Sequence, residues 1–318
     1  MSRTLSLLWT LAIVSVLAGE AVPDAKSQKA VLVTGASSGI GRKITEKLAA
    51  DGYFVYAGAR KEEDLKALGA IRNVQAIRLD VTKLEDIDAA VETVKHAGRG
   101  LYGLVNNAGV ATWGTFAEMK PEEFDLVMAV NVAGPYRISK AFQPLIVAEK
   151  GRITNIGSVS GILARPRVGA YAMSKHAIEA YTDSLAQQLA GFGVTVNVIE
   201  PGNYASDVVK NAIKRGGGPQ ATSAASSVNE DGDPAEVATA VEKALFEPNP
   251  KRRYLVVPNQ YQAEVTIRKQ IEQLVQLNEG QPYTYDRDTL INMLSDALAQ
   301  SRPRYLDDVN GAAAQRRP

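Results

Sequence analysis

The sequence contains no cysteine, which excludes disulfide bonds and thiolate metal sites. Only two histidines are present, His96 and His176, and they lie far apart, so we expect neither a histidine zinc site nor a Ser-His-Asp triad, and no metal. The net charge is +1 over 318 residues with no long run of one sign, so we expect no nucleic-acid partner. These absences leave the chemistry of tyrosine, lysine, serine and carboxylates.

The longest apolar run lies near the amino terminus, from Leu5 to Ala18, and Arg3 precedes it. A membrane-spanning helix needs roughly 20 apolar residues, so this run is short. A positive start followed by an apolar stretch and small residues is typical of a signal peptide; an uncleaved anchor and a buried helix are the alternatives. We therefore expect an exported or membrane-anchored protein, with membrane association through residues 5–18. A cytoplasmic protein is the alternative.

A glycine-rich turn follows the first predicted strand. Ala30 to Val33 form a short apolar run typical of a buried parallel strand. The next residues, TGASSGIG, contain glycines at 35, 39 and 41 and lead into a helical pattern. Glycines let the backbone approach a pyrophosphate, which then lies at the helix amino terminus. The order strand, glycine turn and helix predicts a nucleotide site.

Predicted strands and helices alternate about six times, which indicates an α/β fold: a doubly wound parallel sheet, or Rossmann fold, covered on both faces. In such sheets ligands bind where the strands end. The residues at or just after predicted strand ends are Gly35, Arg60, Asp80, Asn107, Ser158 and Pro201.

Arg60 distinguishes between two dinucleotides. An acidic residue at the end of the second strand usually binds the ribose hydroxyls of NAD(H), but Ala59 and Arg60 stand there. A guanidinium matches a phosphate, which favours NADP(H) over NAD(H). The alternative is an ordinary surface arginine at the start of the next helix.

Tyr171 and Lys175 lie four residues apart, on the same face of a predicted helix. A neighbouring ammonium favours the phenolate, so we expect Lys175 to lower the pKa of Tyr171 from about 10 toward neutrality. Ser158, at the end of the preceding strand, could bond the same reacting oxygen. The alternative is an ordinary surface helix.

Other segments are assigned by pattern. Thr82 and Glu85 predict a capping box. Residues 1–28 form the signal or anchor and a linker, 29–260 the nucleotide-binding domain, and 203–234 a mobile substrate loop within it, or a disordered insertion. Residues 261–318 form a helical extension and a frayed tail, with helices expected at 263–277 and 288–298.

Together these motifs resemble the classical short-chain dehydrogenase/reductase family: TGASSGIG, the NNAG at 106–109, and Asn131, Ser158, Tyr171 and Lys175. The resemblance implies that Tyr171 is the general acid/base, assisted by Lys175 and Ser158, and that Asn131 keeps a proton-relay water; a helix kink is the alternative for Asn131. The amino-terminal run and the carboxyl-terminal extension lie outside the classical core; the amino-terminal run and the EPGNYAS segment are similar to those of retinol and hydroxysteroid dehydrogenases. The implied cofactor-binding residues are Gly35, Ser37, Ser38, Gly39, Ile40, Gly41, Arg60, Asp80, Val81, Asn107, Ala108, Gly109, Tyr171, Lys175, Pro201, Gly202 and Ser206.

The sequence thus predicts an NADP(H)-dependent oxidoreductase that interconverts a carbonyl and an alcohol on a small, apolar molecule such as a retinoid, steroid or lipid. NADP-binding members of the family often carry a second basic residue inside the glycine turn, but Ser37 and Ser38 stand there, so the cofactor prediction depends on Arg60, with help expected from Arg42. A homodimer or homotetramer is expected. The main alternative is a non-catalytic NADP(H)-binding sensor or scaffold; a sugar-nucleotide epimerase is disfavoured by the glycine spacing.

Overall fold

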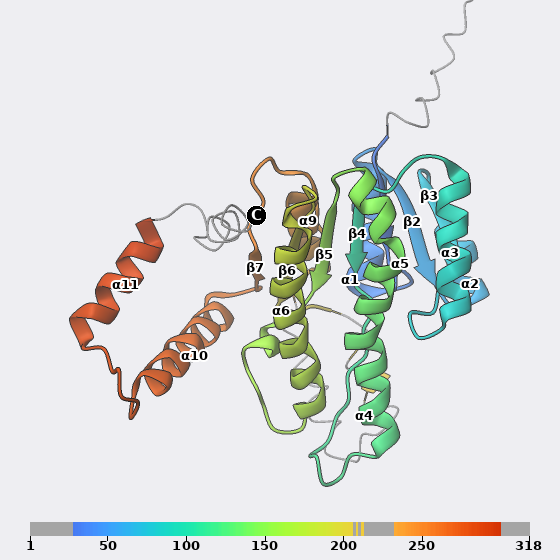
Figure 1. Cartoon of the computed structure of the whole chain (residues 1–318). Helices are drawn as coiled ribbons and strands as arrows, with labels where there is room; N and C mark the ends of the chain where they lie inside the picture. The colour runs from blue at the N-terminus through green and yellow to red at the C-terminus, as the bar shows by residue number, and fades with distance from the viewer. Residues whose placement is uncertain (1–27, 206–207, 209–210, 213–231, 300–318) are drawn as a thin grey trace, which may run out of the picture.

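A single parallel sheet organises the protein. The computed structural model describes residues 28–205, 208, 211–212 and 232–299. Within them, seven strands lie in the order β3-β2-β1-β4-β5-β6-β7 (Figure 1). The strands are β1 (Ala30–Val33), β2 (Phe54–Ala59), β3 (Val74–Arg78), β4 (Gly103–Asn106), β5 (Arg152–Ile156), β6 (Thr195–Pro201) and β7 (Arg253–Val256). The predicted doubly wound fold is confirmed.

Alternate residues of the same strands enter two separate hydrophobic cores. Leu32, Leu104 and Ile153 pack with α3 (Leu84–Ala97), α5 (Gly134–Ala148) and α6 (Gly169–Ala190). Val31, Val33 and Val105 face the other way and pack with α1 (Gly39–Ala50), α2 (Glu62–Gly69) and α9 (Pro234–Phe246). Figure 1 shows α5 and α6 in front of the sheet and α9 behind it. Burial on both faces explains why these strands read as continuous apolar runs.

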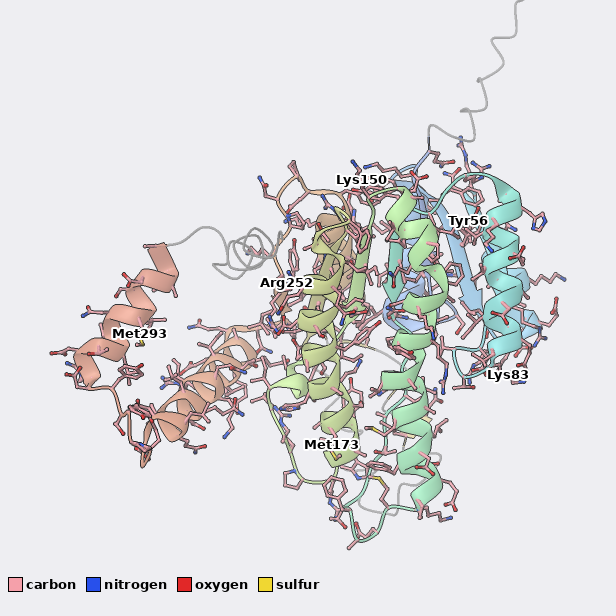
Figure 2. All side chains as sticks on the ribbon, in the orientation of Figure 1. Tyr56, Lys83, Lys150, Met173, Arg252 and Met293 are labelled. Atoms are coloured by element: carbon pink, nitrogen blue, oxygen red, sulfur yellow. The ribbon has the colours of Figure 1, made fainter. Side chains whose placement is uncertain are left out.

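The direction in which successive strands are added across the sheet changes between β1 and β4. From β1 the chain runs outward through β2 to β3, then crosses back to β4 and continues through β7 at the other edge. Each described pair of neighbouring strands is parallel. All carboxyl ends therefore lie at one edge of the sheet, and the point where the order reverses is where ligands bind in such sheets. In Figure 2, Lys83 and Met173 lie toward this end and Lys150 toward the opposite one.

A π-helical turn interrupts the long helix that crosses the sheet. It covers Ala129–Ala133, between α4 (Pro121–Met128) and α5. Pro135 has no N–H to donate to the carbonyl of Asn131 four residues earlier, so a regular α-helix cannot continue there. Extra-residue turns of this kind occur often at functional sites.

The carboxyl-terminal helices extend from the sheet domain. They are α10 (Gln260–Asn278) and α11 (Arg287–Ala299), close to the predicted bounds, and Figure 1 shows them to one side of the sheet. In α10 only Thr266 is buried, and α11 buries no residue. Within the described residues, the first turn of α10 meets the sheet domain through a hydrogen bond from Asn203 N to Gln262 Oε1. Among the described helices, none is long and apolar enough to cross a membrane, and residues 5–18 lie outside that part.

Candidate functional site

The glycine turn after β1 has backbone conformations that residues other than glycine rarely adopt. Gly35 and Gly39 have φ angles of 66° and 53°, in the left-handed region. A Cβ on Gly41 would overlap the carbonyl oxygen of Gly35 and the side-chain nitrogen of Asn107. The first two glycines therefore shape the turn, and the third lets α1 approach it closely.

Thr34 and Asn107 lock this turn onto the end of β4. Thr34 Oγ1 accepts hydrogen bonds from the backbone N–H groups of Asn107 and Ala108, both at 3.0 Å. In return Asn107 Nδ2 donates to the carbonyls of Thr34 and Gly35, at 2.9 and 3.0 Å. Both Nδ2 hydrogens of Asn107 are thus used within the protein, so its amide nitrogen supports the turn. Gly109, two residues on, lies near Asn131 Oδ1.

The amino terminus of α1 fits a phosphate group. Ser38 is the N-cap residue, but its side chain makes no capping hydrogen bond, and the first turn of α1 contains no acidic residue. Unsatisfied N–H groups and the helix dipole at such an end favour an anion. Ser37 and Ile40 flank this end in the same turn. The expected help from Arg42 is limited, because its Nε lies 2.6 Å from Glu46 Oε1 and is paired there.

Arg60 and Asp80 follow neighbouring strands at the same edge. Arg60 is exposed directly after β2, and among the described residues no hydrogen bond or ion pair holds it. Asp80 stands two residues beyond β3, not within it as predicted, and its Oδ1 accepts from Thr82 N and Oγ1 at 3.0 and 2.7 Å. Burial raises the pKa of Asp80, but these bonds, with the nearby Arg60 charge, outweigh it and lower the pKa overall. Val81 is buried beside them.

The predicted capping box is wrong. The N-cap residue of α3 is Lys83, and Thr82 instead bonds the Asp80 carboxylate. The short aspartate side chain folds back onto the backbone two residues later, which competes with helix capping.

Lys175 is anchored against the end of β5. Its Nζ donates to the carbonyl of Ile156 at 2.7 Å and lies 5.6 Å from the centre of the Tyr171 ring. Burial lowers the pKa of Lys175 to about 8, and the Glu179 charge opposes this. Ser158 lies two residues beyond β5 and caps a short turn, where its Oγ accepts from Ser160 N at 3.0 Å. Tyr171, Lys175 and Ser158 therefore converge at the carboxyl edge of the sheet.

The expected shift of Tyr171 is not present in this structure. Burial raises the pKa of Tyr171 above its ordinary value, and a hydrogen bond with the Ser158 side chain only partly opposes this. The lysine does not dominate because its ammonium is itself buried and donates to Ile156. The prediction of a lowered pKa considered the charge of Lys175 without the cost of burying a phenolate.

Asn131 lies in the π-helical turn, and its side chain makes three hydrogen bonds within the protein. Its Oδ1 accepts from Val110 N at 2.9 Å, and its Nδ2 donates to Val110 O at 2.8 Å and Ser174 Oγ at 3.0 Å. Asn131 thereby joins the loop after β4 to α6, where its partner Ser174 directly precedes Lys175. The helix is interrupted here by the π-helical turn, and the role of Asn131 in holding a relay water stays a prediction.

Pro201 and Gly202 end β6 at the same edge, and the carboxyl-terminal extension contacts them. Gln262 Oε1 accepts from Asn203 N at 2.9 Å and occupies the space that a side chain on Gly202 would need. No sequence signal pointed to Gln262, because its partner lies 59 residues away. Ser206 lies outside the described residues.

The loop between Ser158 and Tyr171 packs against the segment after β4. Gly114 N donates to Arg167 O at 2.8 Å, and the Phe116 ring occupies the space beside Gly169. A small hollow of about 130 Å³ lies between these loops. Residues 114–116 were not predicted to form part of the site, and most of the predicted substrate loop, 203–234, lies outside the described residues.

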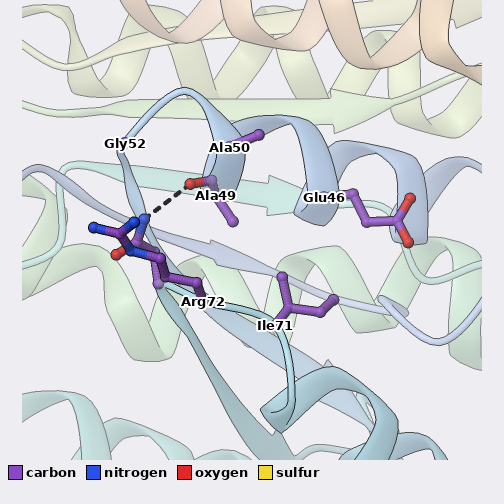
Figure 3. A pocket seen from close by; sticks show the side chains of 7 residues that line it. Glu46, Ala49, Ala50, Gly52, Ile71 and Arg72 are labelled. Carbon is purple, nitrogen blue, oxygen red and sulfur yellow. Dashed lines mark hydrogen bonds between the residues drawn. The ribbon is translucent and has the colours of Figure 1, made fainter.

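A second hollow, of about 490 Å³, lies away from these groups. Figure 3 shows it beside Glu46, Ala49 and Arg72, where Asn73 Nδ2 donates to Ala49 O at 3.0 Å. These residues lie at the carboxyl end of α1 and before β3, which is the edge of the sheet opposite the glycine turn. This hollow is therefore not part of the candidate site.

A buried network of polar side chains connects the strands and helices that carry the site. Asn106 Nδ2 donates to Ser139 Oγ at 3.0 Å and to Asn155 Oδ1 at 2.9 Å, and Asn155 Nδ2 donates to Thr182 Oγ1 at 2.9 Å. These bonds connect β4, β5, α5 and α6. The sequence analysis did not predict this network, although asparagines within otherwise apolar strands, such as Asn106 and Asn155, indicate buried polar contacts.

Comparison with known proteins identifies the fold and motifs. A family model described as short chain dehydrogenase matches residues 29–216. The chain belongs to this family. A mitochondrial D-beta-hydroxybutyrate dehydrogenase of Mus musculus is 37% identical over 191 residues, covering 57% of this chain and 56% of the relative. Retinol dehydrogenase 16 of Mus musculus is 39% identical over 190 residues, covering 58% and 59%.

Two further matched proteins have a cofactor in their names or titles. An NADPH-dependent 3-dehydrocapnine reductase of Ornithobacterium rhinotracheale is 36% identical over 248 residues, covering 71% of this chain and 87% of the relative. A solved structure of a metagenomic short-chain oxidoreductase in complex with NADP has a TM-score of 0.61 and 29% identity, and the match covers 74% of this chain and 100% of that one. The chain spans about half the length of the first curated relatives that it matches. Family membership and the similarity to retinol dehydrogenases are confirmed.

Proposed function

We propose that this protein is an NADP(H)-dependent oxidoreductase that interconverts a carbonyl and an alcohol. The observation that carries the proposal is the convergence of Ser158, Tyr171 and Lys175 with the glycine turn at one edge of the sheet. When bound, the nicotinamide exchanges a hydride with the substrate carbon. The family to which the chain belongs, and relatives named as dehydrogenases and reductases, support this reaction class.

The residues present fit a dinucleotide. The uncapped amino terminus of α1, with the left-handed Gly35 and Gly39, would hold the pyrophosphate. Arg60 is exposed at the end of β2 with no partner among the described residues, so its guanidinium is available to a ribose phosphate. A reductase relative named for NADPH and a structure solved with NADP support the phosphate-bearing form. Lys175 would contact the nicotinamide ribose.

The protonation states favour reduction at neutral pH. The raised pKa of Tyr171 keeps its phenol protonated, and Lys175, with a pKa of about 8, is mostly an ammonium. The phenol can therefore donate its proton to a carbonyl oxygen that Ser158 also holds by a hydrogen bond. Oxidation would need the phenolate, which the nearby ammonium of Lys175 would stabilise by its charge.

A relay water would be held by the backbone carbonyl of Asn131, since its side chain already makes three hydrogen bonds that fix it to Val110 and Ser174. Pro135 leaves the Asn131 carbonyl without its helical donor, so that oxygen is suited to accept from a water near Lys175. This assigns the predicted relay role to the main-chain carbonyl.

The substrate is proposed to be apolar. Phe116, 61% exposed beside Gly169, and Met173, 45% exposed in the first turns of α6, present apolar surface near Tyr171. A relative named retinol dehydrogenase supports this class. Membrane association through residues 5–18 and a homo-oligomer stay predictions; sequencing the amino terminus of the mature protein and measuring its mass in solution test them.

Replacement of Tyr171 by Phe tests the reaction. We expect turnover of a panel of ketones, aldehydes and alcohols to fall by at least about 100-fold, because the proton donor is lost. NADPH affinity should stay within about threefold, since the ring remains. A wild-type protein that binds NADPH but turns over no member of the panel would instead support the sensor or scaffold. Turnover by Tyr171→Phe close to wild type would refute the tyrosine mechanism.

A further inference from the structure

A pair of buried carboxyl groups lies behind the candidate site and has no role in the proposed reaction. Glu179 follows Lys175 by one turn of α6, and its side chain is 15% exposed. Glu200 is the penultimate residue of β6, and its side chain is 4% exposed. Tyr171, Lys175 and Glu179 are spaced four apart, so they share one face of α6.

The charges around this pair do not balance if every carboxyl is ionised. Arg253 Nε lies 3.2 Å from Glu179 Oε2 and 3.6 Å from Glu200 Oε1. The same guanidinium places Nη2 2.6 Å from Asp183 Oδ2, so one cation faces three carboxyl groups. Lys175 is the other nearby cation, and its Nζ donates to Ile156 O.

Buried oxygens of this pair also lack hydrogen-bond donors. Neither carboxylate oxygen of Glu179 accepts a hydrogen bond from the described residues, and nor does Glu200 Oε1. Both carboxyl groups lie beside the same Arg253 Nε, at 3.2 and 3.6 Å, and a proton on one of them would supply the hydrogen-bond donor that these oxygens lack. A shared proton removes one buried negative charge and satisfies two otherwise unpaired oxygens.

Glu179 also supports the segment that carries Ser158. A Cβ on Gly157 would lie 2.9 Å from Glu179 Oε1, and one on Gly161 would lie 3.1 Å from the same oxygen. These two glycines border the turn that Ser158 caps. The carboxyl group therefore fills the space beneath this turn, and Gly157 N is bonded to Ile199 O, beside Glu200, at 2.7 Å.

We propose that Glu179 and Glu200 share one proton at neutral pH, and that Glu179 is a positioning residue that holds the Gly157–Gly161 segment, and with it Ser158, against Tyr171. The role of Ser158 rests on the proposed function, whereas the shared proton does not.

The direction of the pKa shifts agrees with this geometry. Burial, followed by the charge of Glu200, raises the pKa of Glu179 to about 8, and burial also raises that of Glu200. A carboxyl whose folded-state pKa exceeds its unfolded value stabilises the protein fully only below the unfolded pKa. Its contribution is lost as pH rises from about 4.5 to about 8, at no more than about 1.4 kcal/mol per pH unit.

Two measurements that need no substrate test the shared proton. Infrared spectra of the wild type near pH 7 should show a protonated carboxylic acid band that is absent from Glu179→Gln. The midpoint of thermal unfolding should fall for the wild type between about pH 5 and about pH 9, and fall less for Glu179→Gln, whose amide donates to Glu200 at every pH. Glu92→Gln, at an exposed carboxyl, should follow the wild type. Absence of the band, or parallel unfolding curves for the wild type and Glu179→Gln, would overturn the proposal.

Turnover with NADPH and the carbonyl panel tests the positioning role. Glu179→Gln should stay within about threefold of the wild type near pH 7 and exceed it above about pH 8, where the native pair ionises. Glu179→Ala should lose roughly tenfold to a hundredfold, since the Ser158 turn loses its support. Equal losses in the Gln and Ala variants would overturn the role. If the wild type has no turnover, the proposed function and the positioning role both fail, while the infrared and unfolding measurements still decide the shared proton.

Discussion

Replacing Asn131 by Ala separates a structural role of this side chain from a purely chemical one. The side chain is 2% exposed and makes three hydrogen bonds, of 2.8, 2.9 and 3.0 Å, to Val110 and Ser174. The variant leaves the backbone N–H and C=O of Val110 without these partners. We therefore expect a large loss of stability as well as of activity.

The magnitude follows from the count of bonds. Each hydrogen bond contributes about 1 kcal/mol net, so the three together give roughly 3 kcal/mol, and unsatisfied groups of Val110 add to this. For a domain of this size, 1 kcal/mol corresponds to roughly 2–4 °C, so the unfolding midpoint should fall by about 6–12 °C. A side chain that only held a water would change stability by less than about 0.5 kcal/mol.

Urea unfolding followed by circular dichroism measures this difference, with an unchanged m-value as the check that the denatured state is the same. Asn197→Ala is the matched control. Asn197 is also fully buried, but it donates only one long bond, 3.3 Å to Ala244 O, so its loss should be smaller by about 2 kcal/mol. Equal losses for the two variants, or an Asn131→Ala protein as stable as the wild type, would refute the reasoning.

Three further variants test other parts of the site. Arg60→Ala should weaken NADPH binding at least tenfold in fluorescence titrations, since a charge-assisted bond is lost, with NADH affected less than about threefold; equal losses would contradict the phosphate contact. Gly41→Ala should lower the unfolding free energy by about 1–3 kcal/mol because its Cβ meets Gly35 O, whereas Gly191→Ala, in open space, should not. Ending the chain after Gly280 should leave the unfolding midpoint within about 1 °C, since α11 buries nothing; a larger fall would show that the helix packs on the domain.

Local signals in the sequence were sufficient for the fold. Short segments of four to seven residues rich in apolar side chains predicted the strands, because burial on both faces favours continuous apolar segments. An aspartate followed by proline is a typical helix start, and the structure has Asp233 as the N-cap residue of α9, with its Oδ1 accepting from Ala235 N at 2.9 Å. Strand ends were less certain: Asp80 and Ser158 lie two residues beyond their strands, since no hydrophobic pattern marks where pairing stops.

The sequence by itself determined which residues meet, because the carboxyl ends of parallel strands share one edge and the four-residue spacing aligns Tyr171 with Lys175. Only the tertiary structure decided what those residues do to one another. In the folded protein Lys175 donates a hydrogen bond to the Ile156 carbonyl, and burial raises the pKa of Tyr171, whereas the sequence predicted a lowered pKa. The tertiary structure also brought Glu200 and Arg253 to Glu179 from distant strands. Burial and long-range partners set the electrostatics of a site, and neither is encoded in local spacing.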